Sequence, residues 1–355
     1  MRTITTSPHI HSGASTQDIM FSVAAAMTPS CLWGIYCFGF RSFWVLFVSV
    51  FAALLTEYVL GKVSKEFTLW DGSALVTGML VGMNMSPQVP LFIPALASFF
   101  AIAVAKWTFG GLGANWANPA IAGRIFVFFS FSSEMSNFVT PRMIGGADFV
   151  SSATPMSLIK TAVNAGESLG MNSLEILASE GFPVSGFASR LSAVTGLNPY
   201  NIDAFIGNIP GCIGEVSAIL LIAGAVYLFC KKIITWHIPF SYLGFYALFT
   251  WIFGGIPYGL GAFRGEAIAS MLRGGLILAA FFMATDMVTA PLTHKGQIIF
   301  GAGCGFFTFL FRYFGSLPEA ASVAILLMNM VTPTIDKFII PRVFGTVKAK
   351  KGAAK

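Results

Sequence analysis

The chain has 355 residues, of which 55% are hydrophobic and only 10% are charged. Soluble domains carry about 25% charged residues, so this composition, with a mean hydropathy of +0.76, excludes an ordinary soluble protein. The formal net charge of +6 comes largely from basic residues near the ends of apolar runs. That pattern orients a membrane protein and is not a nucleic-acid-binding signal.

Successive apolar runs predict about ten transmembrane helices, since one span needs roughly 20 residues. The runs lie at 20–40, 42–60, 72–86, 90–107, 118–131, 206–230, 238–257, 264–284, 295–312 and 318–340. The runs that begin at Asp71-Gly72 and at Asn118-Pro119 are short, which predicts helices with broken ends. Breaks are tolerated in a membrane only where protein or a cavity satisfies the backbone, so they point toward a binding site.

The distribution of basic residues predicts that both chain ends face the cytoplasm. The cytoplasmic set is Lys62, Lys65, Lys106, Lys231, Lys232, Lys295, Arg342, Lys348, Lys350, Lys351 and Lys355. The external set is Arg41, Arg142, Lys160, Arg190, Arg264 and Arg312. We therefore expect a cytoplasmic tail at 1–19, a first membrane repeat at 20–131, an external loop at 132–205, a second membrane repeat at 206–340 and a basic cytoplasmic tail at 341–355.

The two membrane parts resemble each other weakly in sequence. The stretch 106–112 is echoed by 312–317, and 42–62 is echoed by 217–232. If each part has about five spans, an odd number, the second is inserted upside down relative to the first. Such an inverted repeat places ligand sites near the interface between the repeats, and chance similarity between apolar runs is the alternative.

Charged residues inside apolar runs are expensive, at ~2.5–3.5 kcal/mol or more at mid-bilayer, so each calls for an explanation. Asp71 and Asp286 occupy comparable broken segments of the two halves, and Glu57 lies within an uninterrupted run. We expect these three carboxylates to belong to an ion pathway, with Asp71 and Asp286 lining a shared cavity. A structural ion pair or a place near the interface is the alternative for each. Further charges of this kind are Arg124, Glu215 and Arg273.

The strongest chemical signal is the stretch 148–155, Asp-Phe-Val-Ser-Ser-Ala-Thr-Pro, in the expected external loop. It resembles the signature Asp-x-x-(Ser/Thr)-Gly-Ala-Thr of one family of membrane proteins. That family comprises the D subunits of Rnf ion-translocating ferredoxin:NAD oxidoreductase complexes and the B subunits of sodium-pumping NADH:quinone reductases. Asp148, Ser151, Ala153 and Thr154 match the signature, and Ser152 stands where the family has glycine. The resemblance implies that Thr154 carries FMN through a phosphoester bond.

The resemblance extends along nearly the whole chain. Its landmarks are 7–9, 70–75, 111–115, 118–120, 123–124, 214–217, 282–286, 289–291 and 341–345, and both chain ends are more similar to the Rnf subunit than to the quinone-reductase one. The family also holds a second, non-covalent flavin, riboflavin, toward the cytoplasm. Asn115 and Asn118 are the candidates to bind it, because an amide both donates and accepts hydrogen bonds. Their other interpretation is capping of the half-helix that begins at Pro119.

The sequence thus predicts an all-α integral membrane protein with about ten transmembrane helices in two inverted five-helix repeats with broken helices. The resemblance implies a bacterial inner-membrane subunit that passes electrons through FMN and riboflavin, coupled to Na⁺ or H⁺ transport. It also implies partners, namely the other Rnf membrane subunits, the flavin-carrying G subunit and the cluster- and NADH-binding C subunit. The alternatives are the quinone-reductase B subunit, a urea-transporter-like small-solute channel and a scaffold subunit without cofactors.

Two classes of motif are missing from the sequence. The four histidines and five cysteines show no metal-ligand spacing, so we expect no metal site and interpret the cysteines as small core residues. No nucleotide-binding fingerprint stands out either, so NAD and ferredoxin chemistry would reside in partner subunits. The chain would then transform no substrate by itself.

Overall fold

The computed structural model describes residues 15–65, 68–145, 151–166, 170–315 and 320–340. Within these ranges the chain is almost wholly helical. Its strands are β1 (Phe138–Val139) and β2 (Ser151–Ser152), which pair antiparallel. The all-α class predicted from the sequence is confirmed.

The part of the chain before the long connection contains both long and short helices. In chain order its elements are α1 (Thr16–Phe38), α2 (Phe40–Ser64), η1 (Leu69–Asp71), α3 (Ser73–Met83), α4 (Phe92–Phe99), η2 (Phe100–Lys106), η3 (Trp107–Phe109) and α5 (Pro119–Ser130). Among the described residues, three helical segments are long and apolar enough to cross a membrane: Thr16–Phe38, Phe40–Ser64 and Phe92–Phe109. Helices α3 and α5 are shorter, as the sequence predicted for the runs after Asp71 and Asn118.

The second membrane part is more interrupted than the sequence suggested. Its elements are α12 (Ala218–Cys230), α13 (His237–Phe253), α14 (Ala267–Met271), α15 (Leu276–Leu278), η4 (Ala279–Met283), α16 (His294–Tyr313) and α17 (Ala321–Phe338). The run 264–284, expected as one span, is divided because Gly274 and Gly275 both adopt positive φ. The run 206–230 yields a helix only from Ala218 onward. Ten complete spans and an inverted repeat stay predictions.

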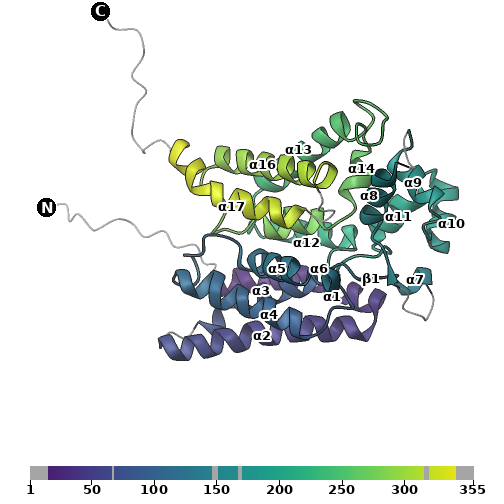
Figure 1. Cartoon of the computed structure of the whole chain (residues 1–355). Helices are drawn as coiled ribbons and strands as arrows, with labels where there is room; N and C mark the ends of the chain where they lie inside the picture. Colours follow the sequence, from purple (N-terminus) through teal and green to yellow (C-terminus); the bar gives the residue numbers. More distant parts are fainter. Residues whose placement is uncertain (1–14, 66–67, 146–150, 167–169, 316–319, 341–355) are drawn as a thin grey trace, which may run out of the picture.

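Where the structure describes it, the connection 132–205, expected as a loop, contains short helices besides the β1–β2 pair. They are α6 (Ser132–Met135), α7 (Arg142–Gly145), α8 (Pro155–Ala165), α9 (Ser173–Ser179), α10 (Gly186–Thr195) and α11 (Pro199–Ile206). We call the described residues of 132–206 the connecting lobe, and Figure 1 shows its helices α7 to α11 at one end of the helix bundle. Side chains of Thr154, Ser185 and Asn198 cap α8, α10 and α11. Local polar residues thus set where these helices begin.

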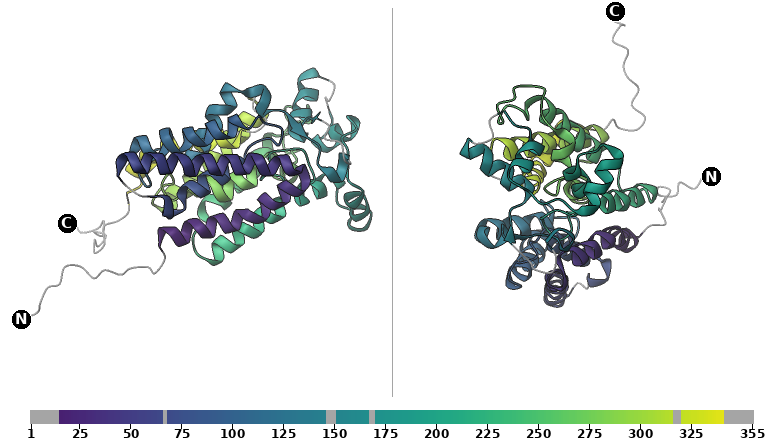
Figure 2. Two further views of the ribbon diagram at one scale, coloured as in Figure 1. Left: turned by 90° about the horizontal axis from the view of Figure 1, so that it is seen from below. Right: turned by 90° about the vertical axis from the view of Figure 1, so that its right-hand side faces the viewer.

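The two membrane parts lie side by side as separate groups of helices, coloured purple to blue and green to yellow in Figure 2. They pack through α1 against α12 and through α5 against α17. Arg124 on α5 donates to the Ser322 hydroxyl on α17 at 2.5 Å. Ser30 on α1 donates to the carbonyl of Gly214 at 2.7 Å. Neither part therefore forms its core alone.

The broken end of α3 is completed by the second membrane part. The backbone N–H of Gly214 donates to the carbonyl of Met83 at 2.9 Å, and that of Ile213 donates to Met85 at 3.0 Å. In hydrocarbon an unpaired backbone group costs several kcal/mol, so these bonds are what permits α3 to stop in the interior. We predicted that a helix break needs protein groups to satisfy its backbone, and here the second membrane part supplies the hydrogen-bond donors.

The cysteines follow the expectation of small core residues with one exception. Cys31, Cys37, Cys212 and Cys304 are buried, whereas Cys230 is exposed at the end of α12. The prediction for Cys230 was wrong: this last residue of α12 lies on its exposed side, although Leu228, two residues earlier, is buried in the core.

Close approach of α1 and α12 yields a prediction about glycine. A Cβ added to Gly224 would lie 2.4 Å from the carbonyl oxygen of Ala26, whereas Gly244 on α13 has no atom within 4 Å of an added Cβ. We predict that Gly224→Ala destabilises the protein by about 1–3 kcal/mol through overpacking. Gly244→Ala, the control, is expected to be neutral or slightly stabilising. Thermal unfolding in detergent measures both, and equal melting temperatures would contradict the close contact.

Candidate functional site

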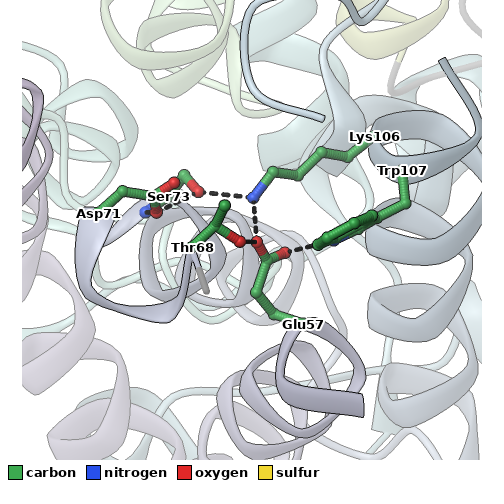
Figure 3. Close-up of polar contacts among 6 residues, drawn as sticks. All are labelled: Glu57, Thr68, Asp71, Ser73, Lys106 and Trp107. Atoms are coloured by element: carbon green, nitrogen blue, oxygen red, sulfur yellow. Dashed lines mark hydrogen bonds and ion pairs between the residues drawn. The ribbon is translucent and has the colours of Figure 1, made fainter. Parts of the chain in front are cut away.

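A buried ion pair lies within the first membrane part (Figure 3). Lys106, only 2% exposed, donates to Glu57 Oε1 at 2.8 Å and to Ser73 Oγ at 2.7 Å. Trp107 Nε1 donates to Glu57 Oε2 at 3.0 Å, and the Thr68 hydroxyl donates to Oε1. Each carboxylate oxygen therefore has a donor. Such complete pairing is the condition under which two charges tolerate burial.

Three elements that are distant in sequence deliver these side chains. Glu57 comes from α2, Ser73 opens α3, and Lys106 ends the π-helical stretch η2. Asp71 fixes the start of α3, because its Oδ1 accepts from the backbone N–H of Ser73 at 2.8 Å and from its hydroxyl at 2.6 Å. A polar chain therefore runs from Asp71 through Ser73 and Lys106 to Glu57, as Figure 3 shows. Short π-helical stretches are frequent at functional sites.

Beside this ion pair lies a cavity between the two membrane parts. Its walls come from α1, α3, η2 and the start of α5 on one side, and from α12 and η4 on the other. The polar side chains that line it are Ser73, Thr77, Lys106, Asn115, Asn118, Thr285 and Asp286. The remaining wall is mainly apolar. A mostly apolar cavity lined by a few polar groups has the chemical character of a small-molecule site.

The two asparagines singled out in the sequence both line this cavity but differ in their bonding. Asn118 caps α5 through Oδ1, which accepts from Ala120 N–H at 3.0 Å, and its Nδ2 donates to the carbonyl of Met283 at 3.2 Å. Asn115 Nδ2 donates to the carbonyl of Ala117 at 3.3 Å, but its buried Oδ1 has no partner among the described residues. A buried acceptor without a donor is costly, so Asn115 presents a vacant hydrogen-bonding position to a ligand.

The carboxylates expected in an ion pathway are only partly brought together. Asp286 lines the cavity, where it accepts from the Thr289 hydroxyl at 3.2 Å. Asp71 is not among the described lining residues and reaches the cavity only through Ser73. Glu57 lies behind Lys106. Among the described residues, Asp286 is thus the carboxylate that lines this cavity. Asp71 is linked to the cavity through Ser73, and Glu57 is linked to it through Lys106.

Sequence reasoning missed Lys106 as a site residue. Lys106 was assigned to the cytoplasmic surface and Arg312 to the external surface, but they are 2% and 4% exposed. Both end apolar runs, which is also where orienting surface charges lie, so position alone does not separate the two cases. A buried glutamate such as Glu57 in another run was the available signal, because a buried carboxylate needs a cation.

The Thr154 motif belongs to the connecting lobe. Ser151 and Ser152 form β2, paired with Val139 and Phe138, while Ala153 is exposed and Asp148 lies outside the described residues.

Thr154 itself is only 5% exposed and caps α8. Its Oγ1 accepts from Ser157 N–H at 3.2 Å and donates to Ser157 Oγ at 3.0 Å. Thr154 also lines a small cavity together with Glu215 and Arg273. An enzyme that esterifies this hydroxyl therefore needs the first turn of α8 to open.

The fold and the cavity define a polytopic helical membrane protein with a mainly apolar cavity between two groups of helices. A family model described as the NQR2, RnfD, RnfE family matches residues 3–345, and the chain belongs to this family. The family resemblance of the sequence is confirmed.

Several relatives are similar to the chain over nearly its full length. The D subunit of the proton-translocating ferredoxin:NAD(+) oxidoreductase complex of Clostridium ljungdahlii is 41% identical over 345 residues, covering 97% of this chain and 96% of the relative. The D subunit of the Na(+)-translocating complex of Acetobacterium woodii is 39% identical over 352 residues, covering 99% and 98%. The D subunit of the ion-translocating oxidoreductase complex of Halorhodospira halophila is 30% identical over 371 residues, covering 98% and 97%.

The buried ion pair predicts strongly non-additive mutational effects. Lys106→Met leaves the Glu57 carboxylate buried without a cation, and Glu57→Gln leaves Lys106 unpaired, so each is expected to destabilise the protein by about 3–5 kcal/mol. The double variant removes both charges and is expected to cost less than the sum of the single variants. Thermal unfolding of the four proteins in detergent measures the coupling. Additive effects would show that Lys106 and Glu57 do not interact.

Proposed function

We propose that this chain is the membrane-embedded D subunit of an Rnf-type ion-translocating ferredoxin:NAD oxidoreductase complex. The observation that carries the proposal is the match to the D subunits of such complexes over nearly the whole length of both chains. As one component of a complex it acts with partners, the other Rnf membrane subunits and the G and C subunits, and not as an enzyme by itself. Family membership also counts against the small-solute channel considered from the sequence.

The proposed architecture is a pair of inverted repeats in the bacterial inner membrane. Similar packing in the two parts supports this architecture. Helix α2 packs on α4 in the first part, and α13 packs on α16 in the second. The buried cations are also arranged alike: Lys106 bonds to residues on α2 and at the start of α3, and Arg312 bonds to Tyr246 on α13 and Ser270 on α14. In this architecture both chain ends face the cytoplasm and the connecting lobe lies outside.

The cavity beside Lys106 is the proposed site of riboflavin. Its mainly apolar lining suits a flat aromatic cofactor, and the unpartnered Oδ1 of Asn115 matches the N–H donor of a flavin ring. Asn118 would hold the wall in place, since its amide is occupied by α5 and Met283. A bound flavin supplies one- and two-electron transfer, while the protein sets its position and potential.

Thr154 is the proposed attachment point of FMN. Its place as N-cap puts an esterified phosphate at the start of α8, where the helix dipole favours an anion. Arg273 and Glu215 line the same small cavity, so the Arg273 cation there is accompanied by a carboxylate. We propose that attachment occurs while the first turn of α8 is open, because the closed turn buries the hydroxyl.

Coupling to ion movement is proposed to involve Asp286. Glu57 and Asp71 would act through their hydrogen bonds to Lys106 and Ser73. Asp286 is the candidate in direct contact with the cavity. The relatives do not identify the ion, since one is named for protons and another for Na⁺.

Loss of the Thr154 hydroxyl is expected to abolish covalent flavin. When Thr154→Ala is co-expressed with the flavin-attaching enzyme, its intact mass should lack the FMN phosphoester present in the wild-type chain. Thr161→Ala removes another hydroxyl from α8 and serves as the control that keeps the adduct. An unchanged adduct in Thr154→Ala would reject Thr154 as the attachment point.

Removal of the Asn115 acceptor is expected to release riboflavin. Asn115→Leu keeps the number and branching of the side-chain heavy atoms but removes the acceptor, together with the donor to Ala117, which should weaken riboflavin binding by about tenfold or more. Asn118→Asp keeps the cap on α5 but loses the donor to Met283, so a weaker effect is expected. Riboflavin extracted per covalent FMN measures the loss. A stoichiometric riboflavin content in Asn115→Leu would place the second flavin elsewhere.

A further inference from the structure

Arg312 is a buried cation that the proposed flavin chemistry does not use. It is 4% exposed, and its guanidinium donates to the Tyr246 hydroxyl at 2.8 Å and to the carbonyls of Ser270 and Gly274 at 3.0 and 2.9 Å. Its Nε, by contrast, is buried without a hydrogen-bond partner in the part of the chain that the structure describes. An unpartnered donor on a buried cation is an energetic cost that a ligand would relieve.

Arg312 differs from Lys106 in how its charge is compensated. Lys106 has the Glu57 carboxylate, and within the described ranges this is the one ion pair. At the corresponding place on α13, Arg312 meets the neutral phenol of Tyr246. The charge of Lys106 is therefore compensated by a carboxylate in direct contact, whereas Arg312 has no ion-pair partner among the described residues.

A second cavity opens beside Arg312, between α8 of the connecting lobe and the end of α16. Its polar lining comes from Lys160, Asn164, Tyr258, Arg312 and Tyr313. Apolar residues of α8 and Phe314 complete the wall. The cavity thus combines two cations, an amide and phenols with an apolar surface.

Lys160 has a structural role that a test must separate from ligand binding. Its ammonium donates to the carbonyl of Arg312 at 3.4 Å and to that of Gly315, so it caps the end of α16. Burial lowers the pKa of Lys160 from its ordinary value, and the neighbouring Arg312 guanidinium lowers it further. Two of its three N–H donors are occupied, which leaves one for a ligand.

We propose that the cavity lined by Lys160 and Arg312 binds a phosphate group, carried either by an anionic phospholipid or by free inorganic phosphate. Guanidinium and ammonium groups are the usual partners of phosphate oxygens. The apolar wall beside the end of α16 suits a lipid, and basic pockets between membrane helices bind anionic headgroups. Charge, vacant donors and cavity lining all favour this class of ligand over a neutral solute.

Native mass spectrometry tests the lipid source. The chain purified in detergent is mixed with phosphatidylglycerol or, separately, with phosphatidylcholine, and bound lipids are counted. We expect selective retention of phosphatidylglycerol, weakened about tenfold or more in Lys160→Gln. Retention is expected in Lys160→Arg and in Lys62→Gln, which removes an exposed lysine from α2. Val163→Phe should also weaken binding, because it fills the cavity without removing a charge.

Thermal unfolding in lipid-free detergent tests the free-phosphate source. Inorganic phosphate is compared with chloride at equal ionic strength, and a rise in melting temperature that Lys160→Gln and Val163→Phe both abolish supports free phosphate. Should Lys160→Gln fail to fold, Val163→Phe and Lys160→Arg decide alone. The proposal would be overturned if neither phosphatidylglycerol nor inorganic phosphate had a selective effect. It would also be overturned if Val163→Phe responded to them as strongly as the wild-type protein does. Binding seen in Thr154→Ala but absent from the wild-type protein would likewise overturn it, because the flavin would then fill the cavity.

Discussion

The structure depends on one constraint: hydrocarbon offers no hydrogen bonds, so every interrupted backbone and every buried charge must find its partner within the protein. Helix α3 can end at Met83 because backbone N–H groups of the second half reach its carbonyls. The side chain of Asn118 likewise bridges from the start of α5 to the carbonyl of Met283 on η4. Each half supplies the bonds that the other half lacks, and this mutual requirement fixes where the two halves meet.

Two of the cavities lie beside buried cations, and they differ in which hydrogen-bonding group is left without a partner. Lys106, neutralised by Glu57, borders a cavity with an acceptor, Asn115 Oδ1, that has no partner among the described residues. Arg312, which meets Tyr246 and carbonyls, borders a cavity and keeps a vacant donor within the same ranges. One site therefore calls for a neutral hydrogen-bond donor and the other for an anion.

The connecting lobe adds a different relation between stability and chemistry. Thr154 holds the first turn of α8 through both hydrogen-bonding directions of its hydroxyl, and this is the atom proposed to carry FMN. A cap typically contributes ~1 kcal/mol, so opening one turn is a modest cost and is compatible with attachment by an enzyme. After attachment, an anionic phosphate at the same helix end is electrostatically favourable. The first turn of α8 is thus compatible with both the free and the esterified Thr154 hydroxyl.

The sequence by itself determined the membrane class, the helical fold, the short helices after Asp71 and Asn118, and the family, because these follow from composition, run length and motif. It indicated Asn115, Asn118 and Asp286 as cavity residues without showing that they share a cavity. Only the tertiary structure decided that Lys106 and Arg312 are buried, that the described part of the connection 132–205 contains short helices, and that Asp71 stands behind Ser73. Apolar periodicity records burial from water but not which protein group satisfies a charge, and that choice is made by residues far apart in the chain.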